Sequence, residues 1–243
     1  SLEFVVYGAS PIAESTIVKA REIMKCDLYQ VYGLTETTGA ITIMMPDDHD
    51  PERGKLRSCG KALKGVELKV IDDDGNDLET GEIGEVISKS KLNMKGYWNK
   101  PDATKESIVD GWFYSGDAGF FDEEGFLFIH DRVKDMIVSG GENIYPAEVE
   151  NALMSHDEIL DAAVVGVPDE KWGESVKGFV VVGESSLSEE EIISYARTQI
   201  AAYKCPKSIE FIKELPRNPS GKILRRELRD PYWEGIDRKV SGN

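Results

Sequence analysis

Residues 1–58 alternate between apolar runs and an amphipathic segment. An apolar run over Leu2–Tyr7 predicts a buried strand, and a second run over Leu28–Tyr32 predicts another. Between them, Ser10 and Pro11 indicate the start of a helix that continues to about Lys25. Three isoleucines supply the apolar positions of this helix, namely Ile12, Ile17 and Ile23.

The loops after these two strands are the first candidate ligand-binding segments. A strand, helix, strand order favours parallel pairing beneath covering helices. In such sheets, ligands bind outside the carboxyl ends of the strands. The loops at those ends are Gly8–Pro11 and Gly33–Gly39.

From Cys59 to His130 the apolar residues alternate over short segments. Short alternating runs separated by turn residues predict a small antiparallel barrel or twisted sheet. Strands are expected at Val66–Ile71, Glu85–Ser88, Trp112–Tyr114, Ala118–Phe121 and Phe126–Ile129. The Gly-Asp pair within Tyr114–Asp117 interrupts this pattern and is expected at a strand end.

A further unit is predicted from Lys134 onward. Met136–Ser139 indicates a strand, Gly140 and Gly141 a tight loop, and Pro146–Met154 a helix with proline in its first turn. Beyond them we expect strands at Ala162–Val167, Gly178–Val182 and Ile209–Ile212, and a helix over Ser188–Ile200 with a Ser188–Glu191 capping box. The predicted fold class is α/β plus α+β. The predicted domains are 1–133, which comprises a βα unit (1–58) and a β-barrel-like part (59–133), and 134–243.

Charge and cysteine content argue against some classes of protein. The formal net charge of the 243 residues is -16, which argues against a nucleic-acid surface. The scattered cysteines Cys26, Cys59 and Cys205 favour free thiols in a reducing, cytoplasmic location. We expect no signal peptide and no transmembrane segment. From Lys204 to Arg229, however, the sequence contains eight Lys or Arg and only three Glu. This stretch is therefore either a solvated basic helix and tail or a segment that binds anions.

Four segments carry candidate chemistry and occur in a fixed order. They are VYGLTETTG at Val31–Gly39, YSGD at Tyr114–Asp117, DRVKDMIVSGGENIYP at Asp131–Pro146 and PRNPSGKILR at Pro216–Arg225. Together they resemble the adenylate-forming superfamily of acyl-CoA synthetases, luciferases and peptide-synthetase adenylation domains. The resemblance implies the fold of that superfamily, a small mobile carboxyl-terminal domain, and ATP, Mg²⁺ and coenzyme A as substrates or cofactors.

The resemblance assigns roles around the nucleotide. Glu36 is expected to bind Mg²⁺, which favours a carboxylate with phosphate oxygens and waters, and Thr35 is expected to contact phosphate. Tyr32 would flank adenine, with Gln30, Val31 and Gly33 beside it. The backbone of Gly8, Ala9 and Ser10 would approach the adenine and the acyl carbonyl. Asp117 would accept hydrogen bonds from the ribose hydroxyls, Arg132 would contact ribose or phosphate, and Ile129 would pack near the nucleotide.

The remaining roles concern the small domain. Lys222 is expected to be the adenylation lysine, whose ammonium stabilises developing phosphate charge. Lys134 is expected to be the hinge, although many members of the superfamily carry Asp there, and Asp131 replaces a common glycine. Ser139, Gly140 and Gly141 would line the path of coenzyme A. Each of these short motifs, taken alone, is also compatible with an ordinary surface turn.

The superfamily's earlier SGTTGxPK-like phosphate loop is absent from these residues. We therefore expect a carboxyl-terminal piece whose partner is the missing amino-terminal half, and which alone is inactive and prone to self-association. Gly33 would leave the acyl pocket open, where acetate-specific relatives carry Trp, and KGYWNKPDAT at Lys95–Thr104 resembles fatty-acyl ligases. These features favour a medium or long fatty acid, or an aromatic acid, as substrate. The alternatives are an adenylation domain that loads a carrier protein, or a non-catalytic piece that only packs against a partner.

Overall fold

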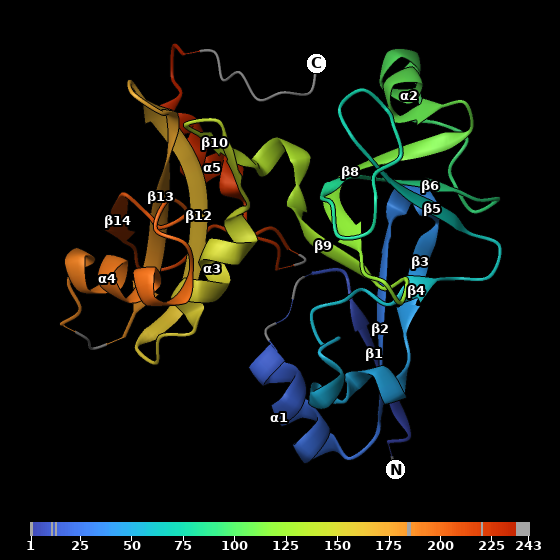
Figure 1. Cartoon of the computed structure of the whole chain (residues 1–243), viewed down its shortest axis with the longest axis horizontal. Helices are drawn as coiled ribbons and strands as arrows, with labels where there is room; N and C mark the ends of the chain where they lie inside the picture. Colours follow the sequence, from blue (N-terminus) through green and yellow to red (C-terminus); the bar gives the residue numbers. More distant parts are fainter. Residues whose placement is uncertain (1, 11, 13, 184–185, 220, 237–243) are drawn as a thin grey trace. The chain divides into compact units, whose positions relative to one another are not determined.

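A computed structural model describes residues 2–10, 12, 14–183, 186–219 and 221–236. Two predicted positions, Pro11 in the first loop and Ser220 in the PSGK motif, lie outside the described residues. The chain divides into two compact units, Ser1–Ile129 and His130–Asn243 (Figure 1). The predicted domain boundary after residue 133 lies slightly further along the chain and stays a prediction.

The first sheet of unit 1 has the strand order β1-β2-β3-β4 (Figure 1). Its first two strands pair in parallel and are joined by helix α1 (Glu14–Met24), which agrees with the expected strand–helix–strand unit. The other pairs are antiparallel, so the sheet is mixed. The strands are β1 (Phe4–Gly8), β2 (Asp27–Leu34), β3 (Gly39–Met44) and β4 (Lys61–Ala62).

One burial expectation in this sheet is wrong. Strand β1 is not buried on both faces, because Phe4 and Val6 are 56% and 54% exposed; alternate residues of a strand point to opposite faces, and only one face is covered. In α1, Ile17 is 1% exposed whereas Ile23 is 79% exposed. Six residues correspond to about 240° around a helix, so Ile23 lies away from the core-facing side.

The second sheet of unit 1 has the order β5-β6-β8-β7, with β9 paired to β8. Its core contains Val70, Val86 and Leu127. The strands are β5 (Glu67–Ile71), β6 (Gly84–Lys89), β7 (Ile108–Val109), β8 (Trp112–Phe121) and β9 (Leu127–Arg132), and a short helix α2 (Pro101–Ser107) precedes β7.

The expectation that the YSGD tetrapeptide lies at a strand end is wrong. The two predicted strands on either side of it are one continuous strand, β8. The pairing of β6 with β8 is irregular between Glu85 and Ile87, and Gly116 has φ 69°. A β-bulge with glycine in the left-handed region lets the strand continue past a residue pair that would otherwise end it.

Unit 2 has a five-stranded sheet in which β14 runs parallel to β13 and the other pairs are antiparallel. Helix α3 (Pro146–Met154) has the predicted bounds, and the Ser188–Glu191 capping box of α4 (Glu189–Gln199) is present. The order is β11-β10-β13-β12. The strands are β10 (Ile137–Ser139), β11 (Glu142–Ile144), β12 (Ile159–Asp169), β13 (Gly173–Val182) and β14 (Ser208–Phe211).

Alternate residues of β12 supply two cores in unit 2. Ala162 and Val164 pack with buried residues of α3 and α4. Ala163 and Val165 pack with Leu228 of the short helix α5 (Arg225–Arg229). The sheet is therefore covered on one face by α3 and α4 and on the other by the α5 segment (Figure 1). Among the described helices, none has the length and apolar character needed to cross a bilayer.

Single turns of 3-10 helix complete the described secondary structure. They are η1 (Thr35–Thr37), η2 (Pro46–His49), η3 (Pro51–Arg53), η4 (Val133–Asp135) and η5 (Asp230–Tyr232).

Candidate active site

Tyr32 of β2 and Asp117 of β8 meet where the two sheets of unit 1 pack together. The Tyr32 hydroxyl donates a 2.6 Å hydrogen bond to Asp117 Oδ2. Burial raises the pKa of Tyr32 far above its usual value, and the negative charge of Asp117 raises it further. Tyr32 is therefore a neutral donor at physiological pH. The residues predicted to flank adenine and to bind ribose thus lie in direct contact.

The bulge in β8 sets the position of Asp117. Its backbone N–H donates to Ser115 Oγ at 3.0 Å, and Ser115 Oγ donates to the Val86 carbonyl. The adjacent Gly116 N–H donates to Glu85 Oε1 at 2.8 Å. Burial raises the pKa of Glu85, the Gly116 N–H opposes this shift, and the charge of Asp117 adds to it. A partly buried, negatively charged site therefore forms around the bulge.

The first predicted loop starts beside the motif of β2. Gly8 pairs with Val31 across the parallel sheet, one residue before Tyr32. The Tyr7 hydroxyl oxygen lies 3.3 Å from Oε1 of the buried Gln30. The carboxyl end of β1 therefore lies next to the predicted nucleotide segment of β2, as the strand order had indicated.

Glu36 lies in the single turn η1 that follows β2. Thr37 is fully buried and fixes this turn, because its hydroxyl contacts the Leu34 N–H and carbonyl and the Gly39 carbonyl at 2.7–2.9 Å. The Glu36 carboxylate accepts a 2.8 Å hydrogen bond from Tyr97, a residue that the sequence analysis gave no role. The neighbouring Thr35 is exposed.

The Glu36 turn suits a magnesium ion only if substrate phosphates and waters supply the other ligands of that ion. Within the described residues, no group of three or more His, Cys, Asp or Glu side chains could enclose a metal. Mg²⁺ commonly takes one or two carboxylates together with substrate phosphates and waters, so a single half-buried carboxylate such as Glu36 is a compatible donor.

Gly33 is required by the backbone around it. A Cβ at this position would overlap the carbonyl oxygen of Gly39, in the irregular pairing of β2 with β3. This close approach explains the glycine without reference to a pocket. The role of Gly33 in an acyl pocket stays a prediction.

In unit 2, the backbone around Lys222 forms a closed turn. Arg217 and Ile223 form an antiparallel bridge, and the Lys222 N–H and carbonyl both bond to Asn218 at 2.9 Å. The Lys222 side chain is exposed, and its ammonium has no ion pair with any described residue. A fixed backbone with an exposed cation suits a residue that binds an anionic ligand.

The predicted coenzyme A segment is a two-residue hairpin loop. Ser139 pairs with Glu142, and the intervening Gly140 and Gly141 have φ of 63° and 87°. Two consecutive positive φ angles are typical of the tightest hairpin turns. Trp172 packs against Gly140, whose N–H donates to the Trp172 carbonyl at 2.8 Å.

Asp131 belongs to a buried ionic cluster that sequence reasoning missed. Arg225 donates to both oxygens of Glu150 at 3.0 and 2.7 Å and lies 3.5 Å from Asp131. Asp131 also accepts the backbone N–H of Arg132 and of Ala147. Burial raises the pKa of Asp131 to about 6, although Arg225 opposes this shift. Asp131 therefore joins the start of the predicted hinge segment to α3 and α5.

The hinge segment has a second link to α5. Arg229 donates to Asp135 at 3.1 Å, immediately after the predicted hinge residue Lys134 in η4. Ile129 is the last residue of unit 1, and Arg132 lies at the end of β9. The predicted residues thus separate into a cluster in unit 1 and a set in unit 2 that comprises Arg132, Lys134, Ser139, Gly140, Gly141 and Lys222.

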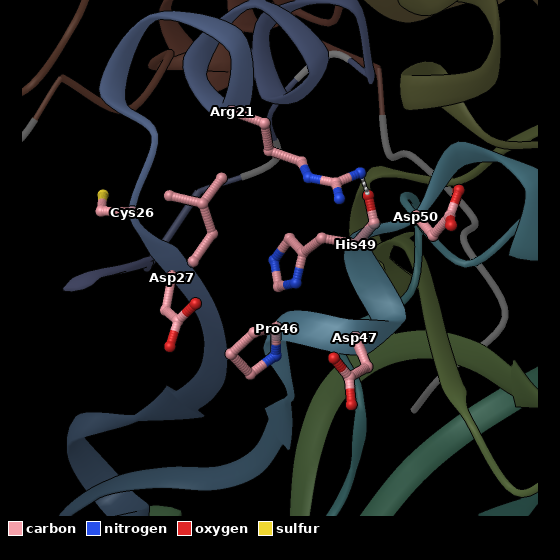
Figure 2. Close-up of a pocket in the computed structure, with 8 residues that line it drawn as sticks. Arg21, Cys26, Asp27, Pro46, Asp47, His49 and Asp50 are labelled. Carbon is pink, nitrogen blue, oxygen red and sulfur yellow. Dashed lines mark hydrogen bonds between the residues drawn. The ribbon is translucent and has the colours of Figure 1, made fainter. Parts of the chain in front are cut away.

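A pocket of about 370 Å³ lies at the amino end of β2, away from Tyr32. His49 is at its centre, and the Arg21 guanidinium donates to the His49 carbonyl (Figure 2). His49 Nδ1 donates to the Met45 carbonyl at 2.8 Å, which leaves Nε2 to accept from Tyr7 at 2.9 Å. Burial lowers the pKa of His49, so this histidine is a neutral packing residue.

Two family models match the chain. The model described as AMP-binding enzyme matches residues 1–98, and the model described as AMP-binding enzyme C-terminal domain matches residues 148–222. The chain belongs to the family of AMP-binding, adenylate-forming enzymes, and the fold predicted from the sequence motifs is confirmed.

The most similar relatives include two bacterial ligases. A fatty acid–[acyl-carrier-protein] ligase, ScoC, of Streptomyces coeruleorubidus is 45% identical over 99% of this chain and 47% of its own length. The long-chain-fatty-acid–CoA ligase FadD13 of Mycobacterium tuberculosis is 42% identical over 94% of this chain and 44% of its own length. The chain thus spans about half the length of these relatives.

A solved structure has the same fold. It is o-succinylbenzoate CoA synthetase (MenE) from Bacillus subtilis in complex with the acyl-adenylate intermediate OSB-AMP. It is 38% identical, with a TM-score of 0.87, and the match covers 94% of this chain and 46% of that one.

Proposed function

We propose that the protein carrying this chain is an AMP-forming acid–thiol ligase. The substrate carboxylate attacks the α-phosphorus of ATP, the bond to the leaving pyrophosphate breaks, and an acyl-adenylate forms. A thiol then attacks the acyl carbon and AMP leaves. The observation that carries this proposal is the contact between Tyr32 and Asp117 beside the Glu36 turn, on the fold of adenylate-forming enzymes.

Each candidate site residue of unit 1 has a role in the first step. Asp117 accepts the ribose hydroxyls while Tyr32 holds one of its oxygens and flanks the base. Gln30, Val31, Gly33 and the backbone of Gly8, Ala9 and Ser10 shape the same site, with Ile129 beside it. Thr35 contacts phosphate, and Glu36 holds Mg²⁺, which when bound neutralises phosphate charge.

The residues of unit 2 act on phosphate and on the second step. Lys222 stabilises the charge that develops on the α-phosphate and pyrophosphate. Arg132 contacts ribose or phosphate, and Lys134 is the pivot between the two steps. Ser139, Gly140 and Gly141 then line the path of the thiol. No side-chain nucleophile takes part, since both attacking groups belong to substrates.

The proposed acid is a medium or long fatty acid or an aromatic acid. The names of ScoC, FadD13 and MenE, which act on fatty acids or on o-succinylbenzoate, support this range. Coenzyme A is the proposed thiol. A carrier protein is the second candidate, because ScoC, at 45% identity, is named for that acceptor.

Two assays on the whole protein test this function. ATP–pyrophosphate exchange, measured with fatty acids of increasing length and with benzoates, should depend on the acid. Product analysis with coenzyme A and with phosphopantetheinylated carrier protein should then identify the acceptor. Acid-independent hydrolysis of ATP, or no exchange with any carboxylic acid, would contradict the proposal.

A further inference from the structure

We propose that Tyr97 is a positioning residue for Glu36. Its hydroxyl holds one carboxylate oxygen and leaves the other directed to the metal–nucleotide complex. This inference rests on the proposed function, because it assumes that Glu36 serves Mg²⁺-bound ATP. Its evidence is separate, and lies in the contacts between the Glu36 turn and the segment that precedes α2.

Both the side chain and the backbone of Glu36 are held by this segment. Tyr97 donates to Glu36 Oε1 at 2.8 Å, and the Met94 N–H donates to the Glu36 carbonyl at 2.6 Å. Next to them, the Thr38 hydroxyl donates to the Leu92 carbonyl at 2.6 Å. Three hydrogen bonds therefore join two segments that lie far apart in the sequence, and the only one to a charged group comes from Tyr97.

Tyr97 is itself fixed by the start of α2. Its backbone N–H donates to Thr104 Oγ1 at 2.9 Å, and the same hydroxyl donates to the Lys100 carbonyl at 2.8 Å. Thr104 lies in α2, so this hydrogen bond ties the backbone of Tyr97 to the helix. This arrangement gives Glu36, a half-buried residue on a single turn of helix, a support outside that turn.

The chemistry of the donor matters as much as its position. A phenol satisfies one oxygen of a carboxylate without cancelling its charge, whereas an ammonium would pair with the charge that Mg²⁺ needs. Lysines are available in the same segment, at Lys91, Lys95 and Lys100, yet they are exposed and form no ion pair with Glu36 in the described chain. No described residue donates to Glu36 Oε2. That oxygen can therefore face a cation.

A double-mutant cycle in the whole protein tests the proposal. The variants are Tyr97→Phe, Glu36→Gln and both together, with Tyr195→Phe as the matched control, since Tyr195 also loses a 2.9 Å hydroxyl bond but lies in unit 2. One readout is Mn²⁺ binding by electron paramagnetic resonance in the presence of α,β-methylene-ATP, which cannot react. The other is the Mg²⁺ dependence of ATP–pyrophosphate exchange.

We expect Tyr97→Phe to weaken Mn²⁺ binding about tenfold, the factor that one hydrogen bond to a charged group typically represents. In the Glu36→Gln background the same change should have less than about a twofold effect, because no carboxylate remains to be positioned. Circular dichroism should show all four variants folded, and Tyr195→Phe should match the wild type.

Two results would overturn the inference while the wild type remains active. One is unchanged Mn²⁺ affinity in Tyr97→Phe. The other is an equal loss from Tyr97→Phe with and without the Glu36 carboxylate, which would assign Tyr97 a packing role only. A wild type with no acid-dependent exchange would instead overturn the proposed function, so the two failures are distinguishable.

Discussion

Tyr32 donates a 2.6 Å hydrogen bond to Asp117, and this contact joins the two sheets of unit 1. Tyr32 belongs to the first sheet and packs on the core of the second, whereas Asp117 lies in a bulge inside β8. The bond occupies one oxygen of Asp117 and fixes the orientation of its carboxylate. A site that binds a nucleoside through this carboxylate is therefore oriented before the ligand arrives.

Asp117→Asn should separate binding from folding. The amide oxygen can still accept from Tyr32, so the free energy of unfolding should change by less than about 1 kcal/mol, while loss of a charged acceptor should raise the KM for ATP about tenfold or more. Steady-state kinetics of the whole protein and urea denaturation measure the two effects. An unchanged KM would restrict Asp117 to holding Tyr32.

Gly33→Ala should destabilise unit 1. The added methyl group would overlap the Gly39 carbonyl, and overpacking against backbone costs about 1–3 kcal/mol. Gly183→Ala is the matched control, since a Cβ there meets only Leu160 at 3.7 Å. Denaturation of the chain followed by fluorescence measures both. Equal stability of the two variants would show that β2 and β3 shift apart easily.

Asp131 should make unit 2 more stable at acidic pH. Its folded-state pKa of about 6 exceeds the ordinary aspartate value of about 3.9, so between these values the folded chain retains a proton that the unfolded chain releases. The contribution of Asp131 to the free energy of unfolding is fully present below about pH 4. It falls by on the order of 2 kcal/mol as the pH rises to about 6.

Asp131→Asn should remove this dependence, whereas the exposed Asp157→Asn should keep it. Urea denaturation of the three chains from pH 4 to pH 7 measures the slope. An identical slope in the wild type and Asp131→Asn would show that Asp131 is ionised throughout this range, in a tight pair with Arg225.

Lys222→Ala should impair one half-reaction. Loss of a preorganised cation should reduce acyl-adenylate formation at least about a hundredfold. Thioester formation from supplied acyl-adenylate should be much less affected, because no pyrophosphate leaves in that step. Single-turnover assays of each step, with the exposed Lys213→Ala as control, check this. Equal losses in both steps would contradict the assigned role of Lys222.

The sequence predicted those features that depend on local signals. Helix α3 has the predicted bounds because Pro146 starts it and its apolar residues follow the helical period. The fold class followed from motifs whose order is preserved along the chain. Strand β8 was divided in two because Gly116 is a strand breaker in most contexts, and only pairing with β6 reveals a bulge.

The contacts that the sequence did not reveal join residues far apart in the chain. Tyr97 lies 61 positions from Glu36, and Arg225 lies 75 positions from Glu150, so no periodic pattern relates the members of either pair. KGYWNKPDAT resembled a family segment, but a resemblance alone did not show what its tyrosine contacts. Packing of the segment against the η1 turn supplies that information.

The central claim is that the whole protein joins a carboxylic acid to AMP before any thiol is involved. The most direct measurement is mass spectrometry of a single-turnover mixture of protein, Mg²⁺-ATP and a panel of fatty and aromatic acids, without a thiol. The account predicts one equivalent of acyl-adenylate and of pyrophosphate, with the adenylate consumed when coenzyme A or a carrier protein is added. Formation of an acyl phosphate and ADP, or thioester formation only without a detectable adenylate, would contradict it.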